Sequence, residues 1–179
     1  MNIALAKNHV RELAKRRIEE FFDNNNRIDA DARIVNRLIN SHLYKNAKRI
    51  FSFYPMQNEP MITEIFKDKS KDFYFPKISG DKILVGTGKL SPGKFGIYEP
   101  VIITNINTFD LILIPAMAFD IHFNRLGRGL GYFDKFLKTV KGFKLGICYD
   151  VQVFASIPFE EHDEKVDGIL TEKRLLLSK

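Results

Sequence analysis

The chain has 179 residues, of which 45% are hydrophobic and 28% charged, the size and balance of one compact domain over residues 1–179 rather than a disordered tail. No apolar run reaches the ~20 residues of a membrane span, and charged residues interrupt the apolar N-terminus, unlike a secretion signal. These features disfavour a membrane protein and predict a cytoplasmic one, and we expect a monomer.

The net charge of +6 is concentrated early in the chain, because residues 1–50 contain 11 Lys and Arg against 6 Asp and Glu. The remaining residues contain 17 against 16. A solvated basic helix face, an anionic metabolite and a nucleic acid would each explain this bias. Cys148 is the only cysteine, which excludes an internal disulfide, and its apolar neighbours indicate a strand residue rather than a nucleophile.

The first predicted element is an amphipathic helix from about Ala4 to Phe22, because its apolar residues recur at spacings of three and four. Lys7 and Arg11 fall along the apolar stripe of this helix. Four other charged residues fall on the opposite side: Glu12, Arg16, Glu19 and Glu20. The two inward cations either lay their stems along apolar surface with their heads in water, or face a bound anion.

A second helix is predicted from about Asp31 to Leu43, followed by a first strand from Arg49 to Tyr54. The expected buried side of this helix comprises Ile34, Val35, Leu38 and Ile39. Five further short strands, rich in branched or aromatic residues, are predicted at Asp72–Phe75, Lys82–Val85, Leu111–Ile114, Lys144–Cys148 and Ile169–Thr171. Leu111–Ile114 is apolar without alternation, as expected for a strand that is covered on both faces.

Ser79–Pro100 carries enough Gly and Pro to form a long excursion at the sheet edge, and Gly86–Lys89 within it is interpreted as a turn rather than a P-loop. Helices separate several of the strands, including one predicted from Phe133 to Val140. This order predicts an α/β, single-domain layered fold with a largely parallel central sheet flanked by helices.

The segment Asn124–Asp134 combines three glycines, two arginines and a carboxylate where a strand should pass into a helix. Glycines can adopt positive φ, and the amides that open a helix attract anions. Asp134, about one turn into the helix, could ligate Mg²⁺ beside a bound phosphate. The spacing G-x-G-x-G fits neither the P-loop nor the dinucleotide fingerprint, and a tight turn remains the alternative to a nucleotide site.

Ile114–Asp120 and Asn124–Asp134 together resemble the signature of the 5-formyltetrahydrofolate cyclo-ligase family. Further matching segments follow in the family's order: Lys7–Arg11, Phe53–Glu59, Gly96–Pro100 and His162–Asp167. The chain departs from the commoner pattern at four positions, with Ala116 for a glycine, Asn58 for an aspartate, Phe133 for a tyrosine and Lys135 for an arginine.

The resemblance implies an ATP-dependent cyclisation of 5-formyltetrahydrofolate to 5,10-methenyltetrahydrofolate, with release of ADP and phosphate. The formyl oxygen would attack the γ-phosphate to give an imidoyl phosphate, on which N10 then closes. Such a reaction depends on positioning and on neutralising phosphate charge rather than on a protein nucleophile.

The resemblance also implies the roles of individual residues. Lys7 and Arg128 would be catalytic, Arg128 by stabilising charge in the transition state. The ATP-binding residues would be Lys7, Arg11, Arg125, Leu126, Gly127, Arg128, Gly129, Leu130, Gly131, Tyr132 and Phe133. The folate-binding residues would be Tyr54, Glu59, Arg128, Gly129, Leu130, Gly131 and Tyr132. Asp134 would bind Mg²⁺, with Asp163 as a second ligand.

Two other functions are compatible with parts of the sequence. An ATP-dependent kinase or ligase of another small metabolite would share the glycine-rich segment and would lack only the folate-side residues Tyr54 and Glu59. A nucleic-acid-binding module would account for the basic first fifty residues and the 12% aromatic content, but it has no need of Asp134 beside a phosphate loop. We therefore expect ATP and 5-formyltetrahydrofolate, with or without a polyglutamate tail, as partners, and neither nucleic acid nor membrane.

Overall fold

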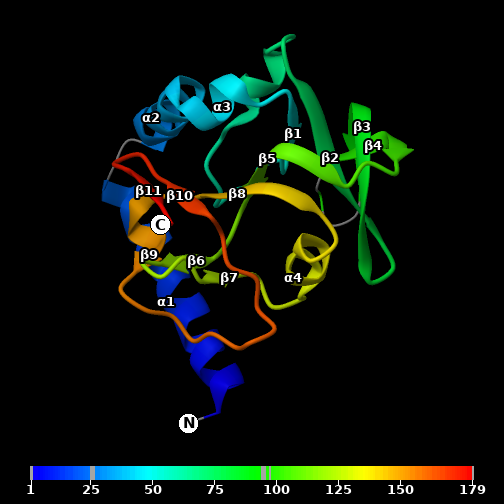
Figure 1. Cartoon of the computed structure of the whole chain (residues 1–179). Helices are drawn as coiled ribbons and strands as arrows, with labels where there is room; N and C mark the ends of the chain where they lie inside the picture. The colour runs from blue at the N-terminus through cyan, green and yellow to red at the C-terminus, as the bar shows by residue number, and fades with distance from the viewer. Residues whose placement is uncertain (1, 25–26, 94–95, 97, 179) are drawn as a thin grey trace.

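The computed structural model describes residues 2–24, 27–93, 96 and 98–178. Eight of its strands form the central sheet: β1 (Arg49–Phe51), β2 (Asp72–Ser79), β3 (Lys82–Pro92), β4 (Tyr98–Thr104), β5 (Thr108–Ile114), β8 (Lys141–Ile147), β10 (Gly168–Leu170) and β11 (Leu175–Leu177). Their spatial order is β11-β10-β8-β5-β1-β2-β3-β4 (Figure 1). The central run from β10 to β2 is parallel, and antiparallel pairs lie at both edges. The predicted α/β fold with a largely parallel sheet is confirmed.

Helices cover both faces of this sheet (Figure 1). Their bounds are α1 (Ile3–Asn24), α2 (Arg27–Asn40), α3 (His42–Asn46) and α4 (Tyr132–Leu137), with 3₁₀ turns at Thr63–Lys67 and Asp150–Gln152. A small second sheet has the order β7-β6-β9, formed by β7 (Arg125–Leu126), β6 (Ala118–Asp120) and β9 (Val153–Phe154). None of the described helices has the length and apolar character needed to cross a membrane.

The strands of the central sheet bury alternate side chains on opposite faces. Ile50, Leu111 and Leu113 pack in one cluster with residues of α2 and α3. Phe51 and Ile112 pack in a second cluster with residues of α4. The apolar run in β5 is therefore buried on both sides, as its lack of alternation predicts.

Several boundaries differ from those predicted. α2 begins at Arg27 and ends at Asn40, because Ser41 caps a separate helix by accepting a hydrogen bond from the Tyr44 amide at 3.1 Å. Ile39, expected on the buried side of α2, is 39% exposed, whereas Ala30 is buried. β1 ends at Phe51, three residues earlier than predicted.

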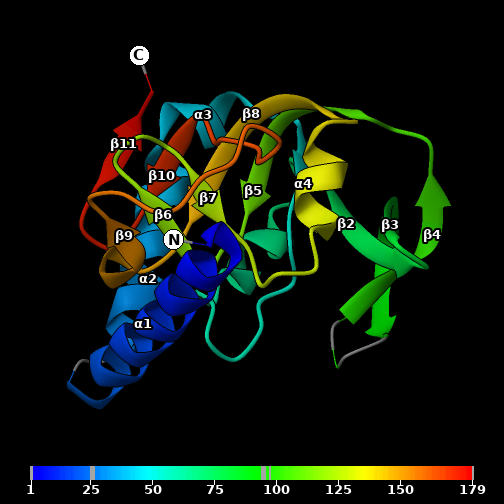
Figure 2. The same ribbon diagram turned by 90° about the horizontal axis from the view of Figure 1, so that it is seen from below.

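The predicted edge excursion is a long antiparallel hairpin of β3 and β4 that extends away from α1 (Figure 2). The expected turn at Gly86–Lys89 is wrong, because these residues lie inside β3, where the pairing register shifts between Thr87 and Leu90. Gly86 is required there for close approach, since a Cβ would lie 2.4 Å from the Pro100 ring. A bulge with local glycines bends the strand without ending it.

Candidate functional site

The glycine-rich segment lies beyond the carboxyl end of β5, at the edge of the sheet where α/β proteins bind ligands. Gly129 has φ +107° and Gly131 has φ +69°, and Gly131 is the N-cap of α4. These two positions use the conformational freedom that the sequence predicted. Gly127 has no positive φ, and its carbonyl accepts a hydrogen bond from Arg11 Nε at 2.9 Å.

A cavity of about 320 Å³ opens between this segment and the segment after β1. Its wall is largely apolar, from residues such as Phe53, Ile78 and Ile83. Most of the predicted site residues line it: Tyr54, Glu59, Arg125, Gly127, Arg128, Leu130, Gly131, Tyr132, Phe133 and Asp134. A separate groove of about 440 Å³ beside α2 and α3 contains none of the predicted residues.

Arg128 joins the glycine-rich segment to the segment after β1. Its Nη2 donates hydrogen bonds to Glu59 Oε1 at 2.9 Å and to Asn58 Oδ1 at 2.8 Å. The Arg128 side chain is 40% exposed, whereas the Glu59 side chain is 7% exposed. A half-exposed cation thus pairs with a buried carboxylate.

Glu59 itself is held by its own segment and by α2. The Met56 amide donates to Glu59 Oε2 at 2.9 Å, and Arg27 Nη2 donates to the Glu59 carbonyl at 3.0 Å. Asp31 accepts hydrogen bonds from the Met61 amide and from the Tyr149 hydroxyl. The buried Tyr149 and the half-buried Arg27 and Asp31 therefore fix the segment that carries Glu59.

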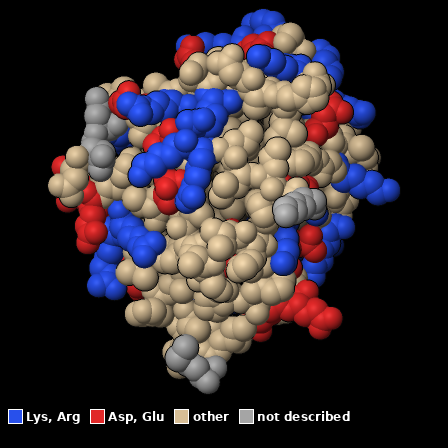
Figure 3. Space-filling view, turned by 60° about the vertical axis from the view of Figure 1, so that its left-hand side comes forward, with Lys and Arg blue, Asp and Glu red and all other residues tan. Residues whose placement is uncertain are grey.

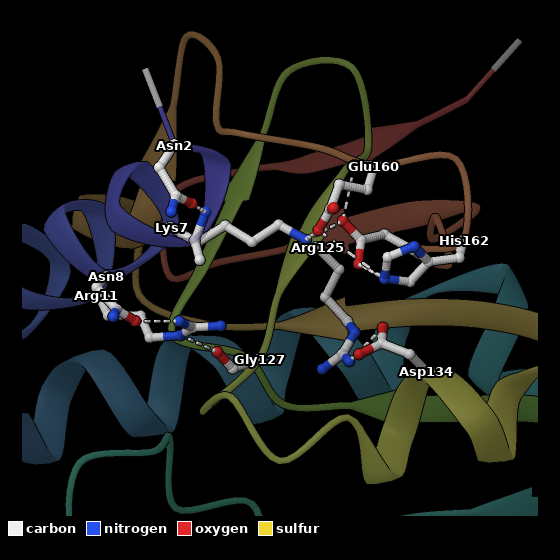
Figure 4. A network of polar contacts seen from close by, with 11 residues as sticks. Asn2, Lys7, Asn8, Arg11, Arg125, Gly127, Asp134, Glu160 and His162 are labelled. Carbon is white, nitrogen blue, oxygen red and sulfur yellow. Dashed lines mark hydrogen bonds and ion pairs between the residues drawn. The ribbon is translucent and has the colours of Figure 1, made fainter.

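Lys7 reaches from α1 to the loop before β10, where Nζ lies 2.7 Å from Glu160 Oε2 and 2.5 Å from Asp163 Oδ2 (Figure 4). The residue is only 8% exposed. Burial alone would lower the pKa of Lys7, but the hydrogen bonds and charges of Asp163 and Glu160 outweigh it and raise the pKa. The inward position of Lys7 agrees with the helix pattern, but its partners are the carboxylates of Glu160 and Asp163.

Arg125 and Asp134 form an ion pair on the other side of this charged cluster, with Nη2 at 2.8 Å from Oδ1 (Figure 4). The Arg125 side chain is 3% exposed, and its guanidinium lies 5.6 Å from the centre of the Phe133 ring. Arg125 Nε is buried without a hydrogen-bond partner among the described residues. Phe133 thus supplies a ring face to Arg125 where a tyrosine would add a hydroxyl.

The carboxylates of Asp134 and Asp163 suit Mg²⁺ by donor type. Each keeps one oxygen, Asp134 Oδ2 and Asp163 Oδ1, outside the hydrogen bonds made with described residues. Ligand atoms of Asp163, Glu160 and His162 also lie within 4.8 Å of one another. Asp163 thus belongs to a group of potential ligands that does not include Asp134, which lines the cavity instead.

Four predicted nucleotide-binding residues lie outside the cavity wall: Lys7, Arg11, Leu126 and Gly129. Leu126 is 3% exposed and packs in the core with Ala14 and Ala118, so only its backbone can face a ligand. Arg11 lies beside Gly129, whose hypothetical Cβ would be 3.5 Å from Arg11 Cζ. Lys7 lies with Asp163 in the adjacent charged cluster.

Sequence reasoning gave no role to three residues that the structure places at the site. Asn58 binds Arg128, the Tyr98 ring packs against the Tyr54 ring at a tilt of 37° with 4.6 Å between ring centres, and Glu99 lines the cavity. Tyr98 and Glu99 belong to the matched segment Gly96–Pro100, which is the signal that could have identified them; Ile97 of that segment lies outside the described residues. Cys148 is buried, which raises the pKa of its thiol and agrees with a structural role.

Comparison with known proteins gives one consistent match. The sequence model of the 5-formyltetrahydrofolate cyclo-ligase family matches residues 5–172. The 5-formyltetrahydrofolate cyclo-ligase of Mus musculus is 31% identical over 165 residues, covering 78% of this chain and 80% of that protein. The probable 5-formyltetrahydrofolate cyclo-ligase of Schizosaccharomyces pombe is 25% identical over 203 residues, covering 97% and 98%.

Solved structures agree with the sequence match. The NMR structure of Aquifex aeolicus 5,10-methenyltetrahydrofolate synthetase has a TM-score of 0.83 and 31% identity, covering 96% of this chain and 92% of that one. A 5,10-methenyltetrahydrofolate synthetase from Mycoplasma pneumoniae has a TM-score of 0.70 and 22% identity, covering 96% and 99%, and shares the fold.

Proposed function

The chain belongs to the 5-formyltetrahydrofolate cyclo-ligase family, an ATP-dependent ligase family, and from this premise we propose how its residues carry out the cyclisation. The formyl oxygen on N5 attacks the γ-phosphorus of ATP, the bond from that phosphorus to the β–γ bridging oxygen breaks, and ADP leaves. N10 then attacks the formyl carbon of the imidoyl phosphate. The carbon–oxygen bond breaks, phosphate leaves, N10 loses its proton, and 5,10-methenyltetrahydrofolate is formed.

The observation that supports this proposal best is the position of Arg128. It projects from the glycine-rich segment and binds Glu59, which lines the cavity proposed for folate. A cation in that place can neutralise the phosphoryl group during transfer from nucleotide to folate. We propose that Arg128 does so, and that Lys7 is the second catalytic cation.

The nucleotide would lie along the glycine-rich segment, where Arg11 and Lys7 approach from α1 (Figure 4). The proposed contacts are the side chains or backbone of Lys7, Arg11, Arg125, Leu126, Gly127, Arg128, Gly129, Leu130, Gly131, Tyr132 and Phe133. Asp134 and Asp163 would hold Mg²⁺, which supplies charge neutralisation on phosphate oxygens when bound. Arg125 holds Asp134 in place by their ion pair.

The folate would occupy the apolar cavity, with its ring against Tyr54 and its nitrogens near Glu59. Arg128, Gly129, Leu130, Gly131 and Tyr132 would face both ligands. Leu130 is 65% exposed, so it is free to cover a bound ligand. This arrangement brings the formyl group and the γ-phosphate together at Arg128.

The direct test is the absorbance of the methenyl product when the protein is mixed with 5-formyltetrahydrofolate, ATP and Mg²⁺. Product that requires ATP supports the proposal, and a control without ATP excludes spontaneous cyclisation. The role of Asp163 as a metal ligand is tested separately, by measuring product formation as a function of Mg²⁺ concentration in the wild type and in Asp163→Asn. Absence of product from folded protein that binds ATP would favour a kinase or ligase of another metabolite.

One face of the molecule argues against a nucleic-acid-binding function. On the face shown in Figure 3, Lys and Arg side chains are interspersed with Asp and Glu rather than forming one continuous basic stripe. Melting temperatures measured with folate, ATP or RNA would discriminate the functions, because a ligand that binds only the native state raises its apparent stability. We expect folate and ATP, but not RNA, to raise the melting temperature.

We also propose that residues 1–179 act as one domain, as a monomer in the cytoplasm. The packing of α1 against β6 and against the 3₁₀ turn at Asp150–Gln152 supports one domain, because it connects the chain's first helix to its C-terminal part. Light scattering of the purified protein would test the monomer. Comparison of mono- and polyglutamylated substrates would test binding of the glutamate tail, and equal affinities would contradict it.

A further inference from the structure

Glu99 is a buried carboxylate in the cavity wall that the proposed mechanism does not use. It lies on the edge strand β4, opposite Ser91 of β3, and is 7% exposed. It lines the same cavity as Glu59 and Arg128. Its strand belongs to the antiparallel hairpin rather than to the glycine-rich segment.

The local backbone is built around this side chain. A Cβ at Gly93 would lie 2.4 Å from Glu99 Cδ and 2.6 Å from Oε2, so a larger residue there would force the carboxylate to move. The other carboxylate oxygen of Glu99, Oε1, accepts a hydrogen bond from the Ile78 amide at 3.3 Å. The Ile78 amide of β2 and Gly93, which follows β3, therefore fix the position of the carboxylate.

Among the residues that the structure describes, Glu99 uses little of its acceptor capacity. Its bond to the Ile78 amide is long, and no cation pairs with it among the described residues. Glu59, by contrast, binds Arg128 through Oε1 and the Met56 amide through Oε2. A carboxylate in a mostly apolar cavity is costly unless N–H donors satisfy it, which indicates that a ligand supplies those donors.

We propose that Glu99 is a substrate-binding residue that accepts hydrogen bonds from the amino edge of the reduced pterin ring, an inference that rests on the proposed function. The 2-amino group and the N3–H of such a ring are adjacent parallel donors, which match a carboxylate. The ring would lie against the apolar wall near Ile78 and Ile83. A carboxylate at this point repels polyphosphate, so it favours the pterin over ATP in this part of the cavity.

Glu99→Gln tests the proposal while retaining an oxygen for the Ile78 amide. We expect KM for 5-formyltetrahydrofolate to rise about tenfold or more, since a hydrogen bond to a charged acceptor is lost. The kcat and the KM for ATP should stay within about twofold. Glu12→Gln on the exposed side of α1 makes the same chemical change away from the cavity and should leave every constant unchanged.

A ligand analogue distinguishes direct contact from a structural role. The analogue has hydrogen in place of the 2-amino group of the reduced pterin. In the wild type it should bind about tenfold more weakly than the parent compound. In Glu99→Gln the two compounds should bind with nearly equal affinity, because the contact is already lost. Equal losses in both proteins, or an unchanged folate KM in Glu99→Gln, would overturn the assignment. Failure of the wild type to form methenyl product would instead contradict the proposed function itself.

Discussion

Arg128 Nη2 donates to Glu59 Oε1 at 2.9 Å, although the two residues are 69 positions apart in the sequence. The contact joins the segment proposed to bind phosphate to the segment proposed to bind folate. A ligand that competes for Glu59 would therefore also release Arg128. We therefore expect folate binding and the position of the proposed phosphate-neutralising cation to be coupled through this ion pair.

Arg128→Ala should abolish turnover, lowering kcat about 10³-fold or more, because it removes the cation assigned to transition-state charge. The protein should still fold, since the Arg128 side chain is 40% exposed, although the buried Glu59 loses its ion-pair partner. Product absorbance and thermal melting measure the two effects. Lys135→Ala is the control, because it removes an exposed cation on α4, and it should retain activity. Near-normal turnover in folded Arg128→Ala would contradict the assignment.

Lys7→Met should destabilise the protein by about 3 kcal/mol, because it leaves Glu160 and Asp163 without their buried cation. The pKa of Lys7 is raised above its ordinary value of 10.5 in the folded state. Its contribution to stability is therefore fully present below that value and is lost as pH rises through the folded pKa. In urea unfolding at pH 8, the free energy of unfolding should be higher for the wild type than for Lys7→Met. This difference should shrink near pH 11.

Lys7→Arg separates charge from shape at the same position. It keeps the positive charge, so it should recover most of the stability and part of the ATP affinity lost in Lys7→Met. A pH-independent difference between wild type and Lys7→Met would show that packing, and not the ion pairs, is responsible. ATP affinity measured beside stability distinguishes loss of the nucleotide contact from loss of fold.

The sequence predicted those parts of the fold and site that depend on neighbouring residues. The spacing of apolar residues predicted α1 and the inward position of Lys7. The apolar run Leu111–Ile114 indicated a strand that is buried on both faces. The β3–β4 hairpin was not predicted, because its glycines and prolines resemble loop composition and the strand survives them through a bulge. Contacts such as Asn58 with Arg128 depend on the order of strands in the sheet, which local patterns do not determine.

Gly129→Ala should raise the KM for ATP about tenfold, because φ +107° lies outside the range that residues with a Cβ adopt. Space is not the obstacle, since the nearest atom to the new Cβ is Arg11 Cζ at 3.5 Å. Gly131→Asn is the matched comparison: φ +69° is within the left-handed region that asparagine tolerates, and no atom lies within 4 Å of the Cβ position. It should change the KM by less than about threefold, and equal effects of both substitutions would contradict this account.

Arg27→Ala should raise the KM for 5-formyltetrahydrofolate about three- to tenfold with little change in kcat, because Arg27 positions Glu59 through its carbonyl rather than touching substrate. Arg33→Ala on the exposed side of the same helix is the control and should leave both constants unchanged. Arg27→Lys should restore part of the loss, since an ammonium can still donate to the Glu59 carbonyl. An equal fall in kcat and kcat/KM would place Arg27 in the chemical step. An unchanged KM would mean that Asp31 and Met56 hold the Glu59 segment without Arg27.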